Sequence, residues 1–470
     1  MKKGFTLIEL LAVILILGII ALIAIPTVNN ILKEAREGAF RTSSDNIMKS
    51  MEEACQTSLI RGDNPVLNYI FTDGKSSSKL EVKGTMPNDG YVFLDRECSV
   101  INFYLTDQNN TYTNGEDVRK DYMLKEPIDN NTSIFKSLYS SYYNNLLSIN
   151  TVNHLNIPEG AIEIKDASVS EAGKIKSWLV QNGSNYDLYI GSEGKIYANY
   201  NSAYLFSGSS ATSITFDNFY TDFVNNMNSM FYNDNLLIFL DLSNWATNNV
   251  INLGAMFEGC SELTTINFDN WNTDSLKYIN NIFKNCFKLA NINISNWNTK
   301  EIVTAAFAFA DCYKITSLNL SNWDVSNLLD MKYMFKSCTG LYDLNISTWN
   351  TKSSVNSYYM FFNCKSLVSL NLSNWEGKNI TTSGFMFSNC SNLEALNIQN
   401  WDMTKLSNQE SMFNGVNKLN NLIIKNADSI NKLSSYLPSK DVVTPGTITI
   451  IGDKTGVDTT TLSSKNWNVE

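Results

Sequence analysis

The sequence predicts an α+β protein built from three successive parts. An apolar run from Phe5 to Ile25 predicts a long N-terminal helix. Weak strand signals follow between residues 60 and 155, and a strict 26-residue repeat then runs eight times from Ala211 to Lys418. Such a period indicates stacked repeats that share one core. A chain of 470 residues is too long for a single ordinary core, so two or three domains are expected.

The apolar run is long enough to cross a bilayer as a helix, at about 1.5 Å per residue. Lys2 and Lys3 precede it, which favours an N-terminus on the cytoplasmic side. Every residue of the run is apolar or Gly except Thr6 and Glu9. A carboxylate in an apolar helix is costly and usually has a specific partner. One helix cannot easily satisfy Glu9, but a bundle of staggered copies that offers a neighbouring amine can.

The first nine residues, Met-Lys-Lys-Gly-Phe-Thr-Leu-Ile-Glu, resemble the prepilin signature of type IV pilins and pseudopilins. The resemblance implies that a prepilin peptidase cleaves after Gly4 and that the new amine of Phe5 is N-methylated. It also implies that Glu9 pairs with the Phe5 amine of a neighbouring subunit during fibre assembly. Gly18 and Pro26 fall where the family's first helix often has Gly and Pro.

Residues 1–4 are therefore expected to be a leader, and residues 5–57 a pilin helix whose part 5–25 lies in the membrane or the fibre core. The protein would be a single-pass membrane protein before assembly and extracellular afterwards. A secretory signal peptide would instead be cleaved after the apolar run, but no Ala-x-Ala site follows Ile25. An uncleaved anchor stays open, although it leaves Glu9 unexplained.

Beyond Pro26 the helical pattern continues to about Thr57. Charges of alternating sign recur at every fourth residue and predict a solvated helix face. These residues are Lys33, Glu37, Arg41, Asp45, Lys49 and Glu53. A looser apolar stripe is expected on the other side. It comprises Ile31, Leu32, Ala35, Ala39, Ile47, Met51 and Ala54.

Residues 58–155 are expected to form a small headpiece. The segments 91–94 and 100–105 are strand-like. That these strands cover the helix as in a pilin is implied by the N-terminal resemblance. Cys55, near the end of the predicted helix, and Cys98, in the headpiece, are either disulfide-bonded or free, because the sequence does not choose between these states.

The repeat unit reads Leu-x-x-Leu-x-Leu-Ser-Asn-Trp, followed later by Met-Phe-x-x-Cys. Trp recurs at 245, 271, 297, 323, 349, 375 and 401, and Cys at 260, 286, 312, 338, 364 and 390. The first motif is the strand signature of a leucine-rich repeat, which predicts a solenoid with a parallel β-sheet. The Cys column is expected to be a row of small buried side chains, since neither disulfides nor a metal suit its spacing.

Asn-Trp, Met-Phe and Cys at these offsets resemble the BspA-like leucine-rich repeat surface proteins of bacteria. We expect an N-terminal cap at residues 160–210, with a hairpin at 186–200. A C-terminal cap is expected at residues 419–470, with strands at 419–424 and 447–451. Members of the family are mostly cell-surface proteins linked to adhesion.

The strand of each repeat should place positions 4 and 6 inward and positions 3 and 5 outward. A column of polar residues then lies on the outer face, together with Phe239 at position 3. Tyr342 comes just before its strand, so the sequence leaves its direction open, and either aromatic residue could add contact area. The position-5 column comprises Asp241, Asn267, Asn293, Asn319, Asn345, Asn371 and Asn397. These amides either bond to one another between repeats or offer donors and acceptors to a glycan or a protein.

The net charge of −10 argues against nucleic-acid binding, and the single histidine, His154, argues against His-based catalysis. The sequence lacks the G-x-S-x-G, H-E-x-x-H and P-loop motifs. No enzymatic activity, cofactor or metal is therefore expected.

The two resemblances, with the size of the repeat region, imply a minor type IV pilin whose repeats form an adhesin head for a host or bacterial surface. Its expected partners are other pilin subunits, the prepilin peptidase and the membrane before assembly, and then a surface protein or glycan. A pseudopilin of a secretion or DNA-uptake system, or a membrane-tethered surface repeat protein, are the alternatives.

Overall fold

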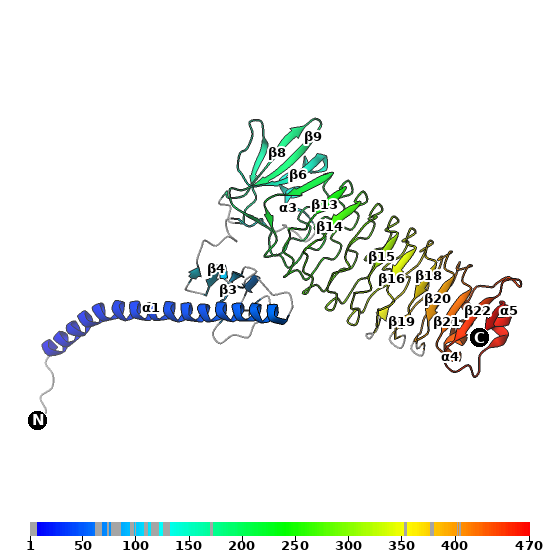
Figure 1. The fold of residues 1–470 in the computed structure, drawn as a ribbon. Helices are drawn as coiled ribbons and strands as arrows, with labels where there is room; N and C mark the ends of the chain where they lie inside the picture. Colours follow the sequence, from blue (N-terminus) through cyan, green and yellow to red (C-terminus); the bar gives the residue numbers. More distant parts are fainter. Residues whose placement is uncertain are drawn as a thin grey trace, which may run out of the picture. The chain divides into compact units, whose positions relative to one another are not determined.

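The computed structural model divides into two compact units, Met1–Asp117 and Val118–Glu470. We call them the N-terminal unit and the C-terminal unit (Figure 1). The residues described are 7–61, 68–72, 75–76, 86–94, 98, 100–107, 111–113, 122–125, 132–169, 173–351, 355–376, 380–401, 403 and 406–470. Gly4 and Phe5, the expected processing site, lie outside these ranges.

The N-terminal unit begins with one long helix, α1 (Leu7–Arg61), which ends four residues beyond the predicted Thr57. Its second half packs on an antiparallel sheet of order β2-β1-β3-β4-β5. The strands are β1 (Asn68–Thr72), β2 (Lys75–Ser76), β3 (Asp89–Leu94), β4 (Val100–Thr106) and β5 (Thr111–Thr113). The predicted strands at 91–94 and 100–105 are confirmed.

The helix face that packs on this sheet differs from the predicted stripe. Ile47 and Met51 are buried as expected, but Ile31 and Leu32 are exposed. The reason is that, within residues 31–61, where the burial of α1 is described, the first buried residue is Phe40, where the sheet covers the helix. Lys33 and Glu37 form one of the expected pairs across a helical turn, at 3.9 Å. Among the described residues, no helix combines the length and hydropathy that a membrane span requires.

The C-terminal unit opens with a five-stranded sheet of order β11-β6-β9-β8-β7. Its strands are β6 (Leu146–Val152), β7 (Ile162–Asp166), β8 (Lys176–Asn182), β9 (Asn185–Gly191) and β11 (Ser213–Phe216). The short elements α3 (Ile134–Leu138), η1 (Tyr143–Asn145), β10 (Ile196–Tyr197) and β12 (Phe219–Tyr220) complete this region.

Two sequence predictions differ from the structure here. The headpiece was expected to extend to residue 155, but β6 pairs in parallel with β9 and β11, so it belongs to the C-terminal unit. The hairpin expected at 186–200 is wrong, because β9 pairs with β8 and β10 pairs with β12. The true hairpin turns at Gly183, whose φ of 63° suits a tight turn that glycine adopts without strain.

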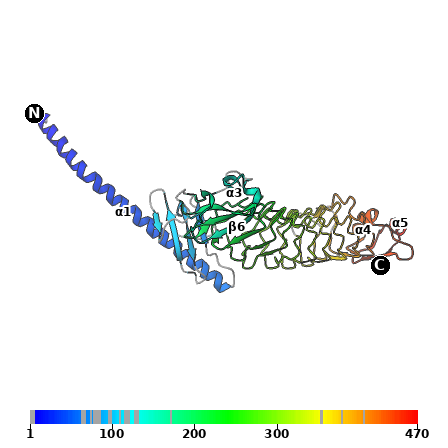
Figure 2. The same cartoon turned by 90° about the horizontal axis from the view of Figure 1, so that it is seen from above.

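The repeats of residues 211–418 follow one another in a row (Figure 2). Their strands are short and pair in parallel at matching positions, as β13 (Phe239–Asp241) with β14 (Thr265–Asn267) and β15 (Ser317–Asn319) with β16 (Asp343–Asn345). The strands β18 (Ser369–Asn371) and β20 (Ala395–Ile398) pair in the same way, and β17 (Val355–Asn356) pairs with β19 (Ile380–Thr382) on another side of the repeats. The C-terminal unit is therefore a repeat-like β structure.

Backbone hydrogen bonds join each repeat to the next over the rest of its course. Met227 N donates to Asn252 O at 2.9 Å, and Phe231 N donates to Met256 O at 2.9 Å. Inside, the Phe column stacks ring on ring at 5.5–5.7 Å from Phe231 to Phe413. Each repeat thus buries its apolar residues against its two neighbours.

The array ends in the sheet β18-β20-β21-β22-β23, with β21 (Asn421–Ile424), β22 (Gly446–Ile450) and β23 (Trp467–Val469). The strands predicted within 419–424 and 447–451 are confirmed. The helices α4 (Ala427–Leu433) and α5 (Thr459–Ser464), with η4 (Ser434–Tyr436), were not predicted. Asn426 and Asp458 cap α4 and α5 through their side chains.

Candidate ligand face

The strands of the array bury one set of side chains and expose the other. We number each repeat from its first aliphatic residue, so that Ile315 is position 1 of the fifth repeat. Ser317 and Asn319 are exposed, whereas Leu318 and Leu320 are buried. The strands β13, β16 and β18 follow the same pattern. We call the outward side chains at positions 2, 3, 5 and 7 the strand face.

In repeats two to eight, the Asp or Asn side chain at position 5 accepts a hydrogen bond from the backbone N–H two residues later in its own repeat. The donor–acceptor distances run from 3.0 to 3.5 Å for Asp241, Asn267, Asn293, Asn319, Asn345, Asn371 and Asn397. Such Asx turns stabilise the bend that follows the strand. Amide–amide bonds between repeats, the first of the two alternatives, do not occur among these described residues.

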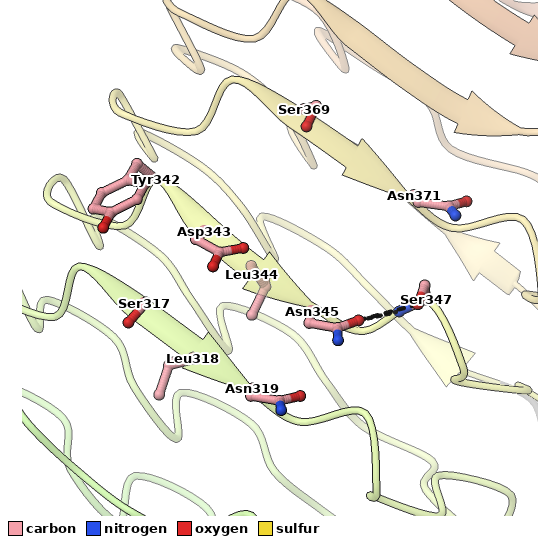
Figure 3. Close-up of a pocket in the computed structure, with 10 residues that line it drawn as sticks. All are labelled: Ser317, Leu318, Asn319, Tyr342, Asp343, Leu344, Asn345, Ser347, Ser369 and Asn371. Atoms are coloured by element: carbon pink, nitrogen blue, oxygen red, sulfur yellow. Dashed lines mark hydrogen bonds between the residues drawn. The ribbon is translucent and has the colours of Figure 1, made fainter.

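The nitrogen atoms of the same amides are uncommitted. Among the residues that the structure describes, Nδ2 of the six asparagines in this column donates no hydrogen bond to the protein. In Figure 3 the oxygen of Asn345 faces Ser347, while its nitrogen lies on the other side of the amide. The turn thus fixes the orientation of each amide and leaves one NH₂ group in each of these six repeats for solvent or a ligand.

A second asparagine column, at position 8, behaves differently. Nδ2 of Asn374 donates to the carbonyl of Ser347 in the preceding repeat at 2.6 Å, and Asn400 donates to Ser373 in the same way. Asn270 and Asn322 make longer bonds of the same kind, at 3.4 and 3.5 Å. These amides hold neighbouring repeats together.

A shallow depression of about 480 Å³ lies on the strand face over repeats five to seven. It is lined by Ser317, Asn319, Tyr342, Asp343, Asn345, Ser347, Ser369 and Asn371, together with Leu318 and Leu344 (Figure 3). Tyr342 is 59% exposed and offers a large aromatic surface at one side of it. Hydroxyl, amide, carboxylate and aromatic groups therefore meet in one site.

A second depression, of about 520 Å³, lies over the first two repeats. Phe239, which is 49% exposed, contributes apolar surface there, and Asp217 and Asp241 contribute carboxylates. The two predicted aromatic residues, Phe239 and Tyr342, thus belong to different depressions.

The strand face carries no basic residue. In none of the eight repeats is position 2, 3, 5 or 7 occupied by Lys or Arg, although the chain has 36 of these residues. Five acidic residues lie at these positions, namely Asp217, Asp241, Asp269, Asp343 and Glu394. The face is therefore polar, weakly acidic and unsuited to a polyanion.

The six cysteines of the array are free and fully buried. The thiol of each donates to a phenylalanine carbonyl of the preceding repeat, as Cys312 does to Phe283 at 3.1 Å. Burial raises the pKa of these thiols, to about 12 for Cys390. They act as small interior side chains, and no cluster of metal-ligating residues occurs among the described residues.

The first repeat departs from this column, because Asp234 stands 26 residues before Cys260. Its side chain is completely buried, and Oδ1 accepts hydrogen bonds from the backbone N–H of Ser209 at 2.6 Å and from the Ser209 hydroxyl at 3.0 Å. Oδ2 has no partner among the described residues. Burial raises the pKa of this carboxyl well above its ordinary value. Sequence reasoning missed this residue, although its spacing from the Cys column could have revealed it.

An aromatic column was also missed. The rings of Phe307, Tyr333, Tyr359 and Phe385 stack in order at centroid distances of 4.5, 5.0 and 4.5 Å. All four have φ between 56° and 59°, a conformation that bulky residues rarely adopt. Their spacing of 26 residues was visible in the sequence. Because the ring faces cover one another, the column stabilises the stack and offers little area for a ligand.

The disulfide and the N-terminal residues complete the predicted set. Cys55 and Cys98 are joined by a disulfide that links α1 to the segment before β4. Glu9 lies within α1, but its side chain is outside the described part of the structure.

Comparison with known proteins finds two sequence families in separate parts of the chain. Residues 1–25 match the prokaryotic N-terminal methylation motif, which supports the type IV prepilin signature and indicates a pilin-like or pseudopilin-like protein. Residues 200–317 and 303–426 each match a family described as "Mycoplasma protein of unknown function, DUF285". The second match falls on the repeats and leaves the BspA-like resemblance unconfirmed.

Among solved structures, the crystal structure of the TLR13–ssRNA13 complex matches with 14% sequence identity and a TM-score of 0.20. The match covers 51% of this chain and 35% of the other, so it extends over about a third of that protein's length. A similarity this low carries no argument about the ligand.

Proposed function

We propose that this protein is a minor type IV pilin whose repeats form a leucine-rich repeat solenoid that acts as an adhesin head. The observation that carries the pilin part is the match of residues 1–25 to the N-terminal methylation motif. In this proposal, cleavage after Gly4 exposes the Phe5 amine, and Glu9 pairs with the Phe5 amine of a neighbouring subunit. A lone carboxylate among the apolar residues of a helix is stabilised by a positively charged partner of this kind.

The adhesin part rests on the strand face. A row of parallel strands presents a long polar surface, and six of its repeats carry an amide NH₂ group that has no partner among the described residues. Stacked repeats commonly bind their partners on such an extended surface. A head this large would crowd a fibre in which every subunit carried it, so we propose a position at the tip or sparsely along the shaft.

Two measurements test the two halves. Mass spectrometry of the mature protein should find N-methylphenylalanine at position 5, and Glu9→Gln should keep the protein in the membrane and out of filaments. Retention of Met1 would contradict the pilin half. The control is the amount of membrane-bound protein, which should be equal for the Glu9→Gln variant and the native chain.

For the adhesin half, residues 118–470 are deleted at the boundary between the two units. Filaments should still form, and attachment to host or bacterial surfaces should fall. The Cys55–Cys98 disulfide serves as a check that the remaining unit is folded. Unchanged attachment would remove the adhesin function, and loss of secreted protein or of DNA uptake would favour a pseudopilin instead.

A further inference from the structure

We propose that the strand face over repeats five to seven binds a neutral, hydroxyl-rich glycan. This inference rests on the proposed function and names the class of ligand for the same face. Its centre is the depression lined by Tyr342, Asp343 and Asn345.

The first argument is the state of the amides. Asn319, Asn345 and Asn371 each commit their oxygen to an Asx turn and leave their NH₂ group without a protein partner among the described residues. The backbone N–H can bond only to the amide oxygen, so the turn dictates which end of the amide is free. Successive strands lie about 4.8 Å apart, and the three NH₂ groups therefore form a fixed row of donors.

The second argument is the mixture of groups beside this row. Ser317 and Ser369 carry hydroxyls, and the carboxylate of Asp343 accepts hydrogen bonds only. A sugar hydroxyl both donates and accepts, so it can bond to the amide NH₂ and to the carboxylate at once. Tyr342, with 59% of its surface exposed, offers an aromatic face on which the apolar side of a sugar ring can pack.

The third argument is charge. The strand face has five carboxylates and no Lys or Arg, so an anionic polymer would meet repulsion without a compensating cation. A basic protein surface would fit the carboxylates, but it would leave the row of amide donors facing other donors. A neutral glycan satisfies both kinds of group.

The asparagine columns supply a selective variant. Asp241 occupies position 5 of the second repeat and makes the same Asx turn, at 3.1 Å, so aspartate is compatible with this position. Asn345→Asp therefore keeps the turn, removes the NH₂ donor and adds a negative charge. Asn414→Asp makes the same change of residue at an exposed position that does not belong to the strand face, and is the matched control.

The experiment measures binding of the full chain, in detergent, to neutral linear hexasaccharides of glucose, galactose, mannose and N-acetylglucosamine by calorimetry. Polygalacturonate and poly-L-lysine serve as the anionic and cationic probes. At least one neutral hexasaccharide should bind and polygalacturonate should not. Asn345→Asp and Tyr342→Ala should each lower the affinity for the neutral hexasaccharide about tenfold, which is the effect of one lost hydrogen bond or ring contact. Asn414→Asp should bind like the native protein, and all variants should keep the native melting temperature.

Two results of the binding experiment would overturn the inference. One is the absence of binding to any of the neutral hexasaccharides. The other is binding to poly-L-lysine alone that strengthens in Asn345→Asp, which would identify a basic protein partner. If attachment depends on residues 118–470 but the hexasaccharides do not compete with it, the glycan inference fails while the proposed function stands. If attachment does not depend on these residues, the proposed function itself fails.

Discussion

Asp234 shows at the scale of one residue how the array begins. Cysteine at this column donates a hydrogen bond across to the preceding repeat, whereas Asp234 accepts from Ser209, in the segment just before the first repeat. The first repeat thus contacts a segment that lies outside the repeats. The side chain at this column accepts a hydrogen bond there, whereas cysteine donates one in the later repeats. The groups around the carboxyl include Tyr143 and Cys260, both buried and neutral.

The raised pKa of Asp234 predicts a pH dependence of stability. The folded state holds this proton more tightly than the unfolded state does, because burial disfavours the carboxylate. The contribution of Asp234 to the free energy of unfolding is therefore fully present below the pKa that this carboxyl has in the unfolded chain. It is lost as the pH rises through the pKa that the carboxyl has in the folded protein. The free energy of unfolding of the Asp234→Asn variant minus that of the native protein should therefore increase as the pH rises from 4 to 8. Urea denaturation followed by Trp fluorescence measures both values. A difference that is constant with pH would contradict this account.

The six array thiols are expected to be unreactive in the folded protein, because they are fully buried and their pKa values are raised. Iodoacetamide followed by mass spectrometry should find all six unmodified under native conditions and all six alkylated in guanidinium. Rapid labelling of the folded protein would show that the Cys column is accessible.

At the scale of elements, the disulfide ties the only long helix among the described elements to the small sheet. It closes a loop across a sequence separation of 43 residues, and a loop of this size contributes about 2–4 kcal/mol to stability. The double variant Cys55→Ser, Cys98→Ser should speed hydrogen exchange of the amides in β3 and β4. All nine tryptophans lie after residue 117, so the urea transition seen by Trp fluorescence should not move. A shifted Trp transition would show that the disulfide also affects the stability of the C-terminal unit.

The elements also show what the sequence could predict and what it could not. The 26-residue period, the outward position-5 residues and the C-terminal cap strands follow from hydrophobic pattern alone, because burial decides them. The two asparagine columns look alike in the sequence, yet Asn374 bonds to a neighbouring repeat and Asn371 does not. That difference depends on interatomic distances across the interface between neighbouring repeats. The inclusion of β6 in the C-terminal unit likewise depends on a pairing with β11, which follows it by more than sixty residues.

For the whole array, stability should depend on contacts between neighbours. Trp349 is fully buried, stacks at 6.2 Å on both Trp323 and Trp375, and donates to Leu320 O at 2.8 Å. Trp349→Ala should cost about 3–5 kcal/mol in free energy of unfolding, the usual range for a buried tryptophan. Hydrogen exchange should accelerate most in repeats five to seven. The exposed Tyr342→Ala variant is the control and should leave the urea midpoint unchanged; equal exchange in all repeats would contradict neighbour-limited stability.

The interface between neighbouring repeats is the same along the interior of the array, and this has a consequence for how the protein can change over generations. Since interior repeats meet their neighbours through the same Phe stacks and backbone bonds, a whole copy can be duplicated or lost without creating a new kind of junction. Each duplication or loss of a repeat changes the length of the array by one strand spacing, roughly 4.8 Å. Recombination between copies can therefore adjust length in fixed steps while both ends stay the same.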